Sequence, residues 1–213
     1  KNLTIKFEMD GIKKITQIDL IHRNSILKIP FEIAGKKETK TGKKTGIIQL
    51  LNEKNEILDN GEIVFQIKNK TETFRKTFIS SIDNSLQYYA VTPPIGPLKE
   101  PLALILSLHG ASVEAINQAG SYYGKNWGVI VCPTNRRPYG FNWEDIGRLD
   151  ALEVLSLTKE KFSVDPERIY LTGHSMGGHG TWHLGVTNPD LFAAIAPSAG
   201  WISFWSYRSR MGI

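Results

Sequence analysis

The sequence contains very little cysteine and no long apolar stretch, and both absences narrow the class of protein. Cys132 is the only cysteine among 213 residues, which excludes an internal disulfide and a cysteine-based zinc or redox site. The longest apolar runs, such as Leu102 to Leu108, have the length of a strand and fall far short of the roughly 20 residues that cross a bilayer. We therefore expect no membrane span and no disulfide framework.

Signals for export and for nucleic-acid binding are also lacking. No charged start followed by an apolar run begins at Lys1, so the start of the chain does not indicate a compartment. The net charge of +5 is concentrated in residues 1–76, which hold 16 Lys/Arg and 10 Asp/Glu, and much of it lies in the lysine-rich run 35–44. No aromatic residues are interleaved there to stack on bases. A solvated loop is therefore favoured over a nucleic-acid interface.

Residues 1–72 alternate apolar and polar side chains at period two, which is typical of half-buried antiparallel strands. The alternation is clearest at Leu3 to Met9, Leu27 to Ile33 and Ile63 to Ile67. Turn signals separate these stretches at Asp10-Gly11, around 35–46 and at Asp59-Asn60-Gly61. We predict an accessory domain over residues 1–72, a small β-sandwich of immunoglobulin-like type.

Residues 73–213 change to alternating strands and helices, the signature of a mostly parallel α/β sheet. A hairpin opens this part, with Asp83-Asn84 at its turn. Continuous apolar runs are typical of strands that are covered on both faces, and they predict strands at Leu102 to Leu108, Val129 to Cys132, Ile169 to Thr172 and Ala193 to Ala196. Helical periodicity predicts helices over 113–123 and 146–162.

The most specific motif is Gly173-His174-Ser175-Met176-Gly177, a Gly-x-Ser-x-Gly sequence between an expected strand and an expected helix. A serine at the tip of a strained strand-to-helix turn needs glycine on both sides, because larger side chains would strike the neighbouring strand and helix. The motif predicts Ser175 as the nucleophile, in a strained backbone conformation, and the N–H of Met176 as an oxyanion donor. The alternative is an incidental serine in a glycine-rich connection.

A second motif, Leu108-His109-Gly110-Ala111, ends an expected strand at the same edge of the sheet. Gly110 permits a close turn, which makes the N–H of Ala111 a candidate for the second oxyanion donor. We interpret His109 as a structural hydrogen-bonding residue beneath this turn rather than as a catalytic base.

With these motifs, residues 74–201 resemble the α/β-hydrolase superfamily, and within it the bacterial esterases related to prolyl oligopeptidase and polyhydroxybutyrate depolymerase. The resemblance is most specific from Asp165 to Gly178 and extends to residues 85–94, 108–111 and 189–197. It implies a serine esterase or peptidase that needs no cofactor and is secreted or periplasmic. It does not extend to residues 1–70.

One departure from this family concerns the acid and the histidine of the triad, which in the superfamily follow the serine on later loops. Only 38 residues follow Ser175 here. They contain Asp190, interpreted as a turn residue, and the pair His179 and His183, whose spacing of four favours a shared helix face and only weakly a metal site. We therefore expect a truncated hydrolase domain without acid and histidine, so that residues 1–213 alone have negligible esterase activity.

The loop after the second parallel strand supplies candidate substrate contacts. They are Asn135, Arg136, Tyr139, Trp143 and Asp145, a mixture of aromatic and polar side chains that suits a sugar-linked or aromatic ester. Packing within the loop explains the same residues equally well. The acids at positions 144, 145 and 150 also fit the N-terminal part of a helix, where the dipole favours negative charge.

These observations predict a serine hydrolase that forms an acyl-enzyme on Ser175 and acts on a small-molecule or polysaccharide-linked ester. The alternatives are a non-catalytic binding module on a hydrolase scaffold and a prolyl oligopeptidase-type peptidase, for which no propeller repeats are visible. We expect no nucleic acid, membrane, metal or cofactor as partner. A truncated sheet would leave an unpaired edge and an uncovered apolar tail, which predicts self-association or completion by a second polypeptide. The tail comprises Trp201, Ile202, Phe204, Trp205 and Tyr207.

Overall fold

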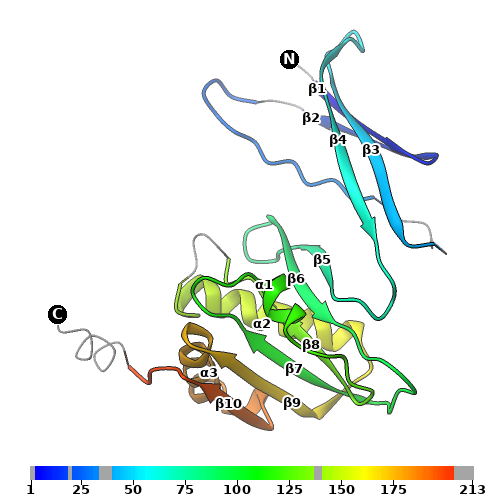
Figure 1. Ribbon diagram of the computed structural model, residues 1–213. Coiled ribbons are helices and arrows are strands. Elements are labelled where there is room, and N and C mark those ends of the chain that lie inside the picture. The colour runs from blue at the N-terminus through cyan, green and yellow to red at the C-terminus, as the bar shows by residue number, and fades with distance from the viewer. Residues whose placement is uncertain (1–2, 19–20, 34–39, 137–140, 204–213) are drawn as a thin grey trace. The chain divides into compact units, whose positions relative to one another are not determined.

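A computed structural model describes residues 3–18, 21–33, 40–136 and 141–203 of the chain. The chain divides into two compact units, Lys1–Asn69 and Lys70–Ile213 (Figure 1). The accessory role expected for the first unit stays a prediction, and each unit is described by itself.

The N-terminal unit contains one antiparallel sheet of four strands in the order β2-β1-β3-β4. The strands are β1 (Leu3–Met9), β2 (Ile12–Ile18), β3 (Gly42–Leu51) and β4 (Ile57–Ile67). Because side chains alternate between the faces of a strand, Phe7 lies on one face of β1, where it is fully buried. Its ring centroid is 5.9 Å from that of Phe65 and 5.8 Å from that of Phe31. These three aromatic rings pack together on the apolar face of the sheet.

The immunoglobulin-like sandwich is not confirmed, because the described residues of this unit form a single sheet. The segment Leu27 to Ile33 was expected to be a strand, but the structure gives it no strand pairing. It instead places Phe31 against Phe7, and period-two alternation cannot distinguish such an extended segment from a paired strand. The turn predicted at Asp59-Asn60-Gly61 is also wrong, since these residues lie inside β4 and pair with β3.

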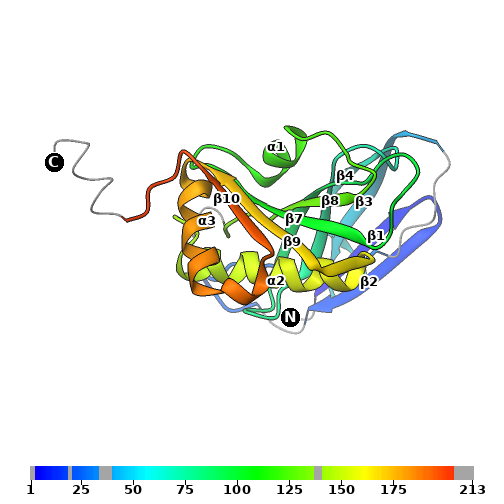
Figure 2. The same cartoon turned by 90° about the horizontal axis from the view of Figure 1, so that it is seen from below.

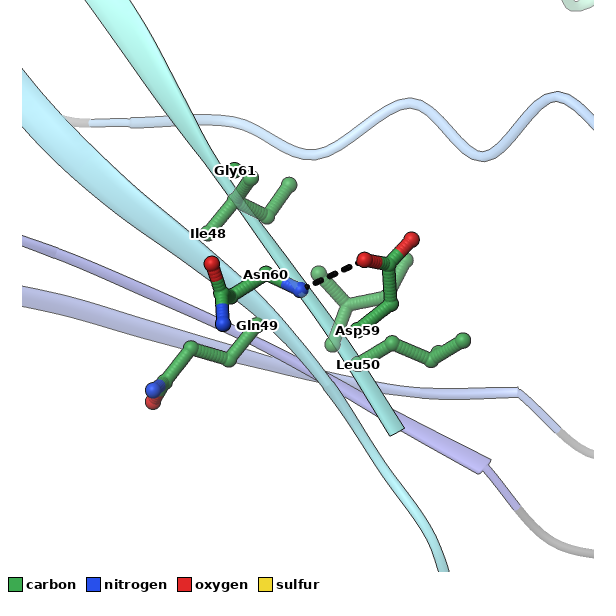
Figure 3. A pocket seen from close by; sticks show the side chains of 7 residues that line it. Ile48, Gln49, Leu50, Asp59, Asn60 and Gly61 are labelled. Carbon is green, nitrogen blue, oxygen red and sulfur yellow. Dashed lines mark hydrogen bonds between the residues drawn. The ribbon is translucent and has the colours of Figure 1, made fainter. Parts of the chain in front are cut away.

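An open hollow of about 300 Å³ lies on this sheet where β3 and β4 pair (Figure 3). It is lined by Ile5, Ile48, Gln49, Leu50, Asp59, Asn60 and Gly61. The one ionisable side chain in this lining is Asp59, whose carboxylate accepts the backbone N–H of Asn60 at 2.8 Å. A lining of aliphatic and amide side chains with a single carboxylate offers no nucleophile and no acid–base pair, so the hollow is not a candidate for the chemistry that Ser175 predicts.

The second unit is a six-stranded sheet in the order β10-β9-β7-β8-β6-β5. Strands β7 to β10 run parallel, and the hairpin β5–β6 pairs antiparallel through β6 with β8. The strands are β5 (Phe74–Ile79), β6 (Leu86–Thr92), β7 (Leu102–Leu108), β8 (Gly128–Cys132), β9 (Val164–His174) and β10 (Ala194–Ser198). The predicted hairpin and the four predicted strands are confirmed, with small changes in their ends. The burial expected for the fourth strand is wrong, because β10 lies at the edge of the described sheet and its residues are exposed or half-buried.

Helices cover both faces of this sheet (Figure 2). Helix α1 (Ala115–Gly120) lies on one face, and α2 (Asp145–Lys161) and α3 (Met176–Thr187) lie on the other, with the 3₁₀ turn η1 (Pro189–Leu191) leading into β10. Along β7, Leu104, Leu106 and Leu108 pack toward α2 and α3, whereas Ile105 joins the small cluster under α1. Burial on both faces explains why β7 reads as a continuous apolar run.

At the edge of the described sheet, β10 has β9 as its one neighbour. In the apolar tail, the ring of Trp201 stacks on His179 at 4.8 Å, and Ile202 is exposed. Phe204, Trp205 and Tyr207 lie outside the described residues, so self-association or completion through this edge stays a prediction. Across the described part of the chain, no helix combines the length and apolarity that a membrane span requires.

Replacement of Leu104, which is fully buried in β7, should strongly destabilise the second unit. We expect Leu104→Ala to lower the free energy of unfolding by about 2–5 kcal/mol, because it removes buried methyl groups and leaves a cavity. All five tryptophans follow residue 70, so tryptophan fluorescence in a denaturant titration reports on this unit alone. The matched control is Leu86→Ala in β6, where the leucine is 54% exposed and the change should stay within about 0.5 kcal/mol. Equal losses in the two variants would contradict the described core.

Candidate active site

Ser175 lies at the tip of the turn between β9 and α3, with φ of 57° and ψ of −119°. Residues with a side chain rarely adopt this backbone conformation, and such strain persists only where the surrounding structure holds it. The N–H of Ser175 donates to the carbonyl of Ser198 at the end of β10 (2.9 Å), and its carbonyl accepts the N–H of His179 (3.0 Å). The strained conformation predicted for Ser175 is confirmed.

Two glycines of the motif are required by the close approach of β7. A methyl group on Gly173 would lie 2.8 Å from the carbonyl oxygen of Leu108. One on Gly177 would strike the same carbonyl and come within 3.0 Å of the carbonyl oxygen of His109. The end of β7 therefore lies directly against the turn that carries Ser175, and only glycine leaves room for it.

The two residues expected to donate to an oxyanion lie in the turns that flank Ser175. Met176 is the first residue of α3, where N–H groups have no intrahelical acceptor and the helix dipole is positive. Ala111 follows Gly110, and a methyl group on Gly110 would lie 3.8 Å from Cβ of Ser175. The structure thus brings the His109-Gly110 turn and the Ser175 turn together.

Three histidines, His109, His174 and His179, have ring nitrogens that lie against groups other than the Ser175 hydroxyl. His179 places Nε2 2.8 Å from Oε1 of Glu144 and Nδ1 2.9 Å from the carbonyl of Trp201. His174 faces the hydroxyl of Ser198 at 3.3 Å. His109 is fully buried between two backbone carbonyls. Among the described residues, no side chain forms a hydrogen bond with Oγ of Ser175.

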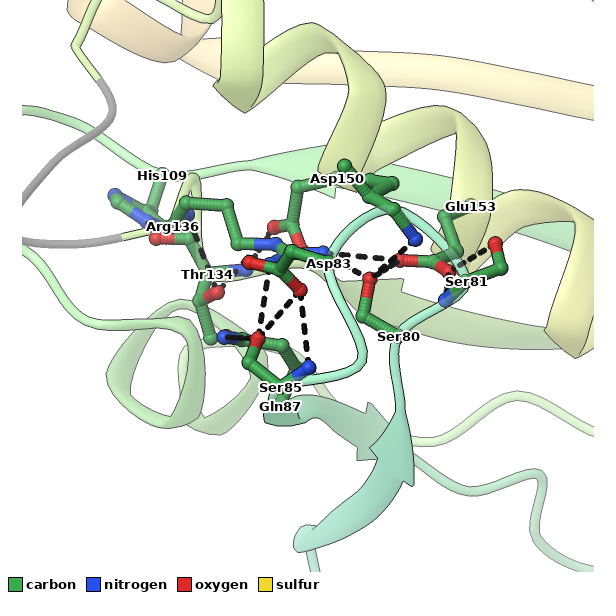
Figure 4. Close-up of polar contacts among 11 residues, drawn as sticks. Ser80, Ser81, Asp83, Ser85, Gln87, His109, Thr134, Arg136, Asp150 and Glu153 are labelled. Atoms are coloured by element: carbon green, nitrogen blue, oxygen red, sulfur yellow. Dashed lines mark hydrogen bonds and ion pairs between the residues drawn. The ribbon is translucent and has the colours of Figure 1, made fainter. Parts of the chain in front are cut away.

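Arg136 was expected among the substrate contacts, but the structure gives it a structural role (Figure 4). Its side chain is 4% exposed and forms ion pairs with Asp150 (3.0 Å), Asp83 (3.1 Å) and Glu153 (3.1 Å). Its guanidinium also donates to the hydroxyl of Ser80. One cation therefore joins the β5–β6 turn, the loop after β8 and helix α2.

Sequence reasoning missed the partners of Arg136. Asp150 and Glu153 are three residues apart on α2, a spacing that places both carboxylates on one helix face. That spacing was an available signal, whereas Asp150 was interpreted as helix N-terminal charge. Asp83 lies in the β5–β6 turn, 53 residues before Arg136, and no local pattern indicates such a distant pairing.

The other loop candidates occupy different environments. Trp143 is fully buried, and its indole N–H donates to the carbonyl of His109 (3.0 Å). It therefore supports the His109-Gly110 turn instead of lining a substrate site. Asn135 is also fully buried, with its amide packed against Gly147. Asp145 is exposed at the start of α2. Tyr139 lies outside the described residues.

The pKa values of the three carboxylates around Arg136 shift in different directions. Hydrogen bonds from the hydroxyl and the N–H of Ser85, with Arg136, lower the pKa of Asp83. Burial acts to raise the pKa of Glu153, but hydrogen bonds from Ser81 and Ser80 lower it overall. Burial raises the pKa of Asp150, and Arg136 counteracts only part of that effect. The charge of Asp150 thus depends on Arg136.

No metal site is evident in the described part of the chain, which contains no group of three His, Cys, Asp or Glu side chains placed to hold an ion. The rings of His179 and His183 stack at 6.4 Å. Because His179 is already bound to Glu144 and to the carbonyl of Trp201, the weak interpretation of this pair as metal ligands gains no support.

Solved structures share the fold of the second unit. The substrate-bound fluorophosphonate-binding serine hydrolase F of Staphylococcus aureus superposes with a TM-score of 0.53 at 20% identity, over 64% of this chain and 60% of that chain. S-formylglutathione hydrolase from the same organism gives a TM-score of 0.54 at 20% identity, over 67% and 61%. These likenesses show that the second unit shares the fold of these two hydrolases.

Proteins of similar sequence include esterases and depolymerases. A family described as putative esterase matches residues 133–210. Poly(3-hydroxyalkanoate) depolymerase C of Paucimonas lemoignei is 30% identical over 54% of this chain and 31% of its own length. The bifunctional acetylxylan esterase/xylanase of Neocallimastix patriciarum is 30% identical over 46% of this chain and 16% of its own length. The chain therefore spans a third or less of these two curated relatives.

Removal of Arg136 should destabilise the second unit in a pH-dependent manner. We expect Arg136→Met to lower the free energy of unfolding by about 3–5 kcal/mol at pH 7, because it leaves the buried carboxylate of Asp150 without its cation. The folded variant binds protons more readily at the three carboxylates than the folded wild type does. The stability difference should therefore shrink as the pH falls toward and below the ordinary values of 3.8 for Asp and 4.5 for Glu.

Denaturant titrations at a series of pH values, followed by tryptophan fluorescence, measure this difference. Arg75→Met is the matched control, because Arg75 is 54% exposed in its ion pair with Glu114 and exposed pairs contribute about 0–1 kcal/mol. A loss for Arg136→Met that does not change with pH would contradict the ion-pair role.

Proposed function

We propose that the second unit is a serine hydrolase that cleaves carboxylic esters through an acyl-enzyme on Ser175. The observation that carries the proposal is the strained serine at the β9–α3 turn, with φ of 57° and the end of β7 packed against its glycines. A serine held in this way presents Oγ at the edge of the sheet, next to the positive end of α3. An incidental serine would not require two glycines at backbone contact distance.

The proposed reaction has two steps. Oγ of Ser175 attacks the ester carbonyl, its proton passes to a base, and the negative charge on the carbonyl oxygen is stabilised by the N–H groups of Met176 and Ala111. The ester C–O bond then breaks, and the proton leaves with the alcohol. Water attacks the acyl-serine in the second step and releases the acid and free Ser175. The two ring nitrogens of His109 lie against backbone carbonyls, and those of His179 lie against Glu144 and the carbonyl of Trp201. We therefore assign the role of base to neither histidine.

We further propose that the alcohol part of the ester belongs to a small molecule or a polysaccharide. The relatives support this class, since their names include an acetylxylan esterase and a feruloyl esterase. Asp145, exposed at the start of α2, remains a proposed substrate contact. Because xylan, the polysaccharide in the name of one relative, lies outside microbial cells, we also propose that the protein is secreted or periplasmic.

Substitution of Ser175 tests the nucleophile directly. We expect the product of the complete gene, as distinct from residues 1–213 alone, to be labelled by a fluorophosphonate probe and to hydrolyse p-nitrophenyl acetate. In that full-length protein, we expect Ser175→Ala to lose both activities, because no other group would carry the acyl intermediate. Labelling followed by mass spectrometry of the peptide that contains position 175 gives the site of attachment.

The matched control is Ser156→Ala, a serine exposed on α2, which should keep the labelling rate and the turnover of the wild type. If the wild-type protein folds but takes up no probe, the esterase proposal fails. The non-catalytic binding module on the same scaffold is then the better interpretation. Turnover that survives in Ser175→Ala would instead show that a different residue is the nucleophile.

A further inference from the structure

The orientation of one peptide unit decides whether Ala111 can donate to an oxyanion. The carbonyl of Gly110 and the N–H of Ala111 belong to the same planar, trans peptide, so they point in opposite directions. A group that fixes the carbonyl oxygen of Gly110 therefore also fixes the direction of the Ala111 N–H. The question becomes which groups bind that oxygen.

Two groups lie against the carbonyl oxygen of Gly110. The backbone N–H of Val113 donates to it at 3.2 Å, and Nδ1 of the His109 ring lies 2.9 Å from it. The His109 ring is fully buried, so water does not compete with it for this carbonyl. The histidine side chain thus binds the peptide unit that immediately follows its own residue.

The other side of the His109 ring is also held. Nε2 lies 3.0 Å from the carbonyl oxygen of Thr134, and the ring of Trp143 packs edge-on against the imidazole at a centroid distance of 4.9 Å. The protonated ring can donate from both nitrogens, whereas the neutral ring can donate from only one. A hydrogen bond to the Gly110 carbonyl therefore needs a proton on Nδ1, and only the protonated ring can bind the Thr134 carbonyl as well.

Thr134 in turn belongs to the Arg136 cluster (Figure 4). Its backbone N–H and hydroxyl lie 3.0 and 3.3 Å from Oδ2 of Asp150, whose other oxygen accepts Nε of Arg136 at 3.0 Å. A continuous series of contacts therefore runs from the buried ion pair through Thr134 to His109 and ends at the Gly110–Ala111 peptide.

We propose that His109 is a positioning residue that sets the orientation of the Gly110–Ala111 peptide and thereby aims the Ala111 N–H at the oxyanion. Its effect on catalysis rests on the function proposed above, but the effect on the peptide does not. His109 touches neither substrate nor Ser175 Oγ in this role. It acts through the backbone that it holds, and Thr134 and Asp150 hold it.

Two amide substitutions separate this role from packing. The side-chain nitrogen of Asn occupies roughly the place of Nδ1, and that of Gln roughly the place of Nε2. His109→Asn therefore keeps a donor to the Gly110 carbonyl and loses the Thr134 contact, whereas His109→Gln does the reverse. If His109 merely filled space, the two variants would differ only through their volumes.

The first measurement is the rate of labelling by the fluorophosphonate probe in the full-length protein. We expect His109→Gln to be slowed by about 100-fold, the effect of losing one oxyanion donor, and His109→Asn to stay within about 5-fold of the wild type, because the donor that orients the peptide is kept. For p-nitrophenyl acetate, the loss in His109→Gln should fall on kcat with KM little changed, since the interaction is made in the transition state.

The second measurement does not depend on activity. The amide signal of Ala111 in a ¹H–¹⁵N spectrum should shift strongly in His109→Gln and stay near its wild-type position in His109→Asn. If the Ala111 signal stays in place in both variants, or moves equally in both, the positioning role is overturned.

The two measurements distinguish failure of this inference from failure of the proposed function. Absence of labelling in the wild type removes the esterase but leaves the amide-shift comparison valid. Labelling in the wild type with equal rates in the two His109 variants removes the positioning role and leaves the esterase. Denaturant titration by tryptophan fluorescence shows whether each variant is folded, and Thr134→Val, which keeps the Thr134 carbonyl, supplies a milder third variant for which we expect wild-type labelling within about 5-fold.

Discussion

The close backbone contact between the end of β7 and the β9–α3 turn is the constraint on which the rest of the second unit depends. The carbonyl oxygens of Leu108 and His109 lie where side chains on Gly173 and Gly177 would have to go. The contact therefore requires glycines on both sides of Ser175, forces the serine into its strained conformation and brings the Gly110–Ala111 peptide beside it. The same contact requires β7 to lie beside β9 in the sheet, as it does in the strand order.

A buried cluster of charges supports this contact from the far side of the loop. Arg136 meets three carboxylates, those of Asp83, Asp150 and Glu153. Serine hydroxyls from the β5–β6 turn donate to Glu153 and Asp83, and Thr134 donates to the second oxygen of Asp150. Buried ion pairs contribute little net stability compared with apolar packing, but they tolerate few alternative arrangements. We interpret the cluster as a device that fixes the loop after β8, and through it the base of the His109-Gly110 turn.

The sequence predicted the second unit far better than the first, for physical reasons. Strands buried on both faces are continuous apolar runs, and the turn that carries Ser175 needs glycines at fixed positions. Both β7 and this turn could therefore be identified from short stretches of sequence. In the N-terminal unit, Leu27 to Ile33 alternates like a strand, but it has no strand pairing and places Phe31 against Phe7. Lys43 and Lys44, the last lysines of the run that suggested a loop, lie in β3. Arg136 and Trp143 resembled substrate contacts because composition alone does not reveal distant partners. Arg136 binds Asp83, 53 residues away, and Trp143 binds the carbonyl of His109, 34 residues away.

The contacts that tie Ser80 and Ser81 to Glu153 span 73 and 72 residues of the chain. Contacts so distant in sequence form late in folding, since the loop between them must close before they contribute. The β5–β6 hairpin, by contrast, has its strands joined by a short turn and can form early. The pairing of Leu104 in β7 with Ile169 in β9 closes a loop of similar length. The centre of the sheet and the anchor of the Gly110–Ala111 peptide are therefore expected to form at a similar stage, and a chain with only its hairpin in place would lack an ordered His109-Gly110 turn. Under the proposed function, such a chain would hydrolyse no ester until these distant contacts close.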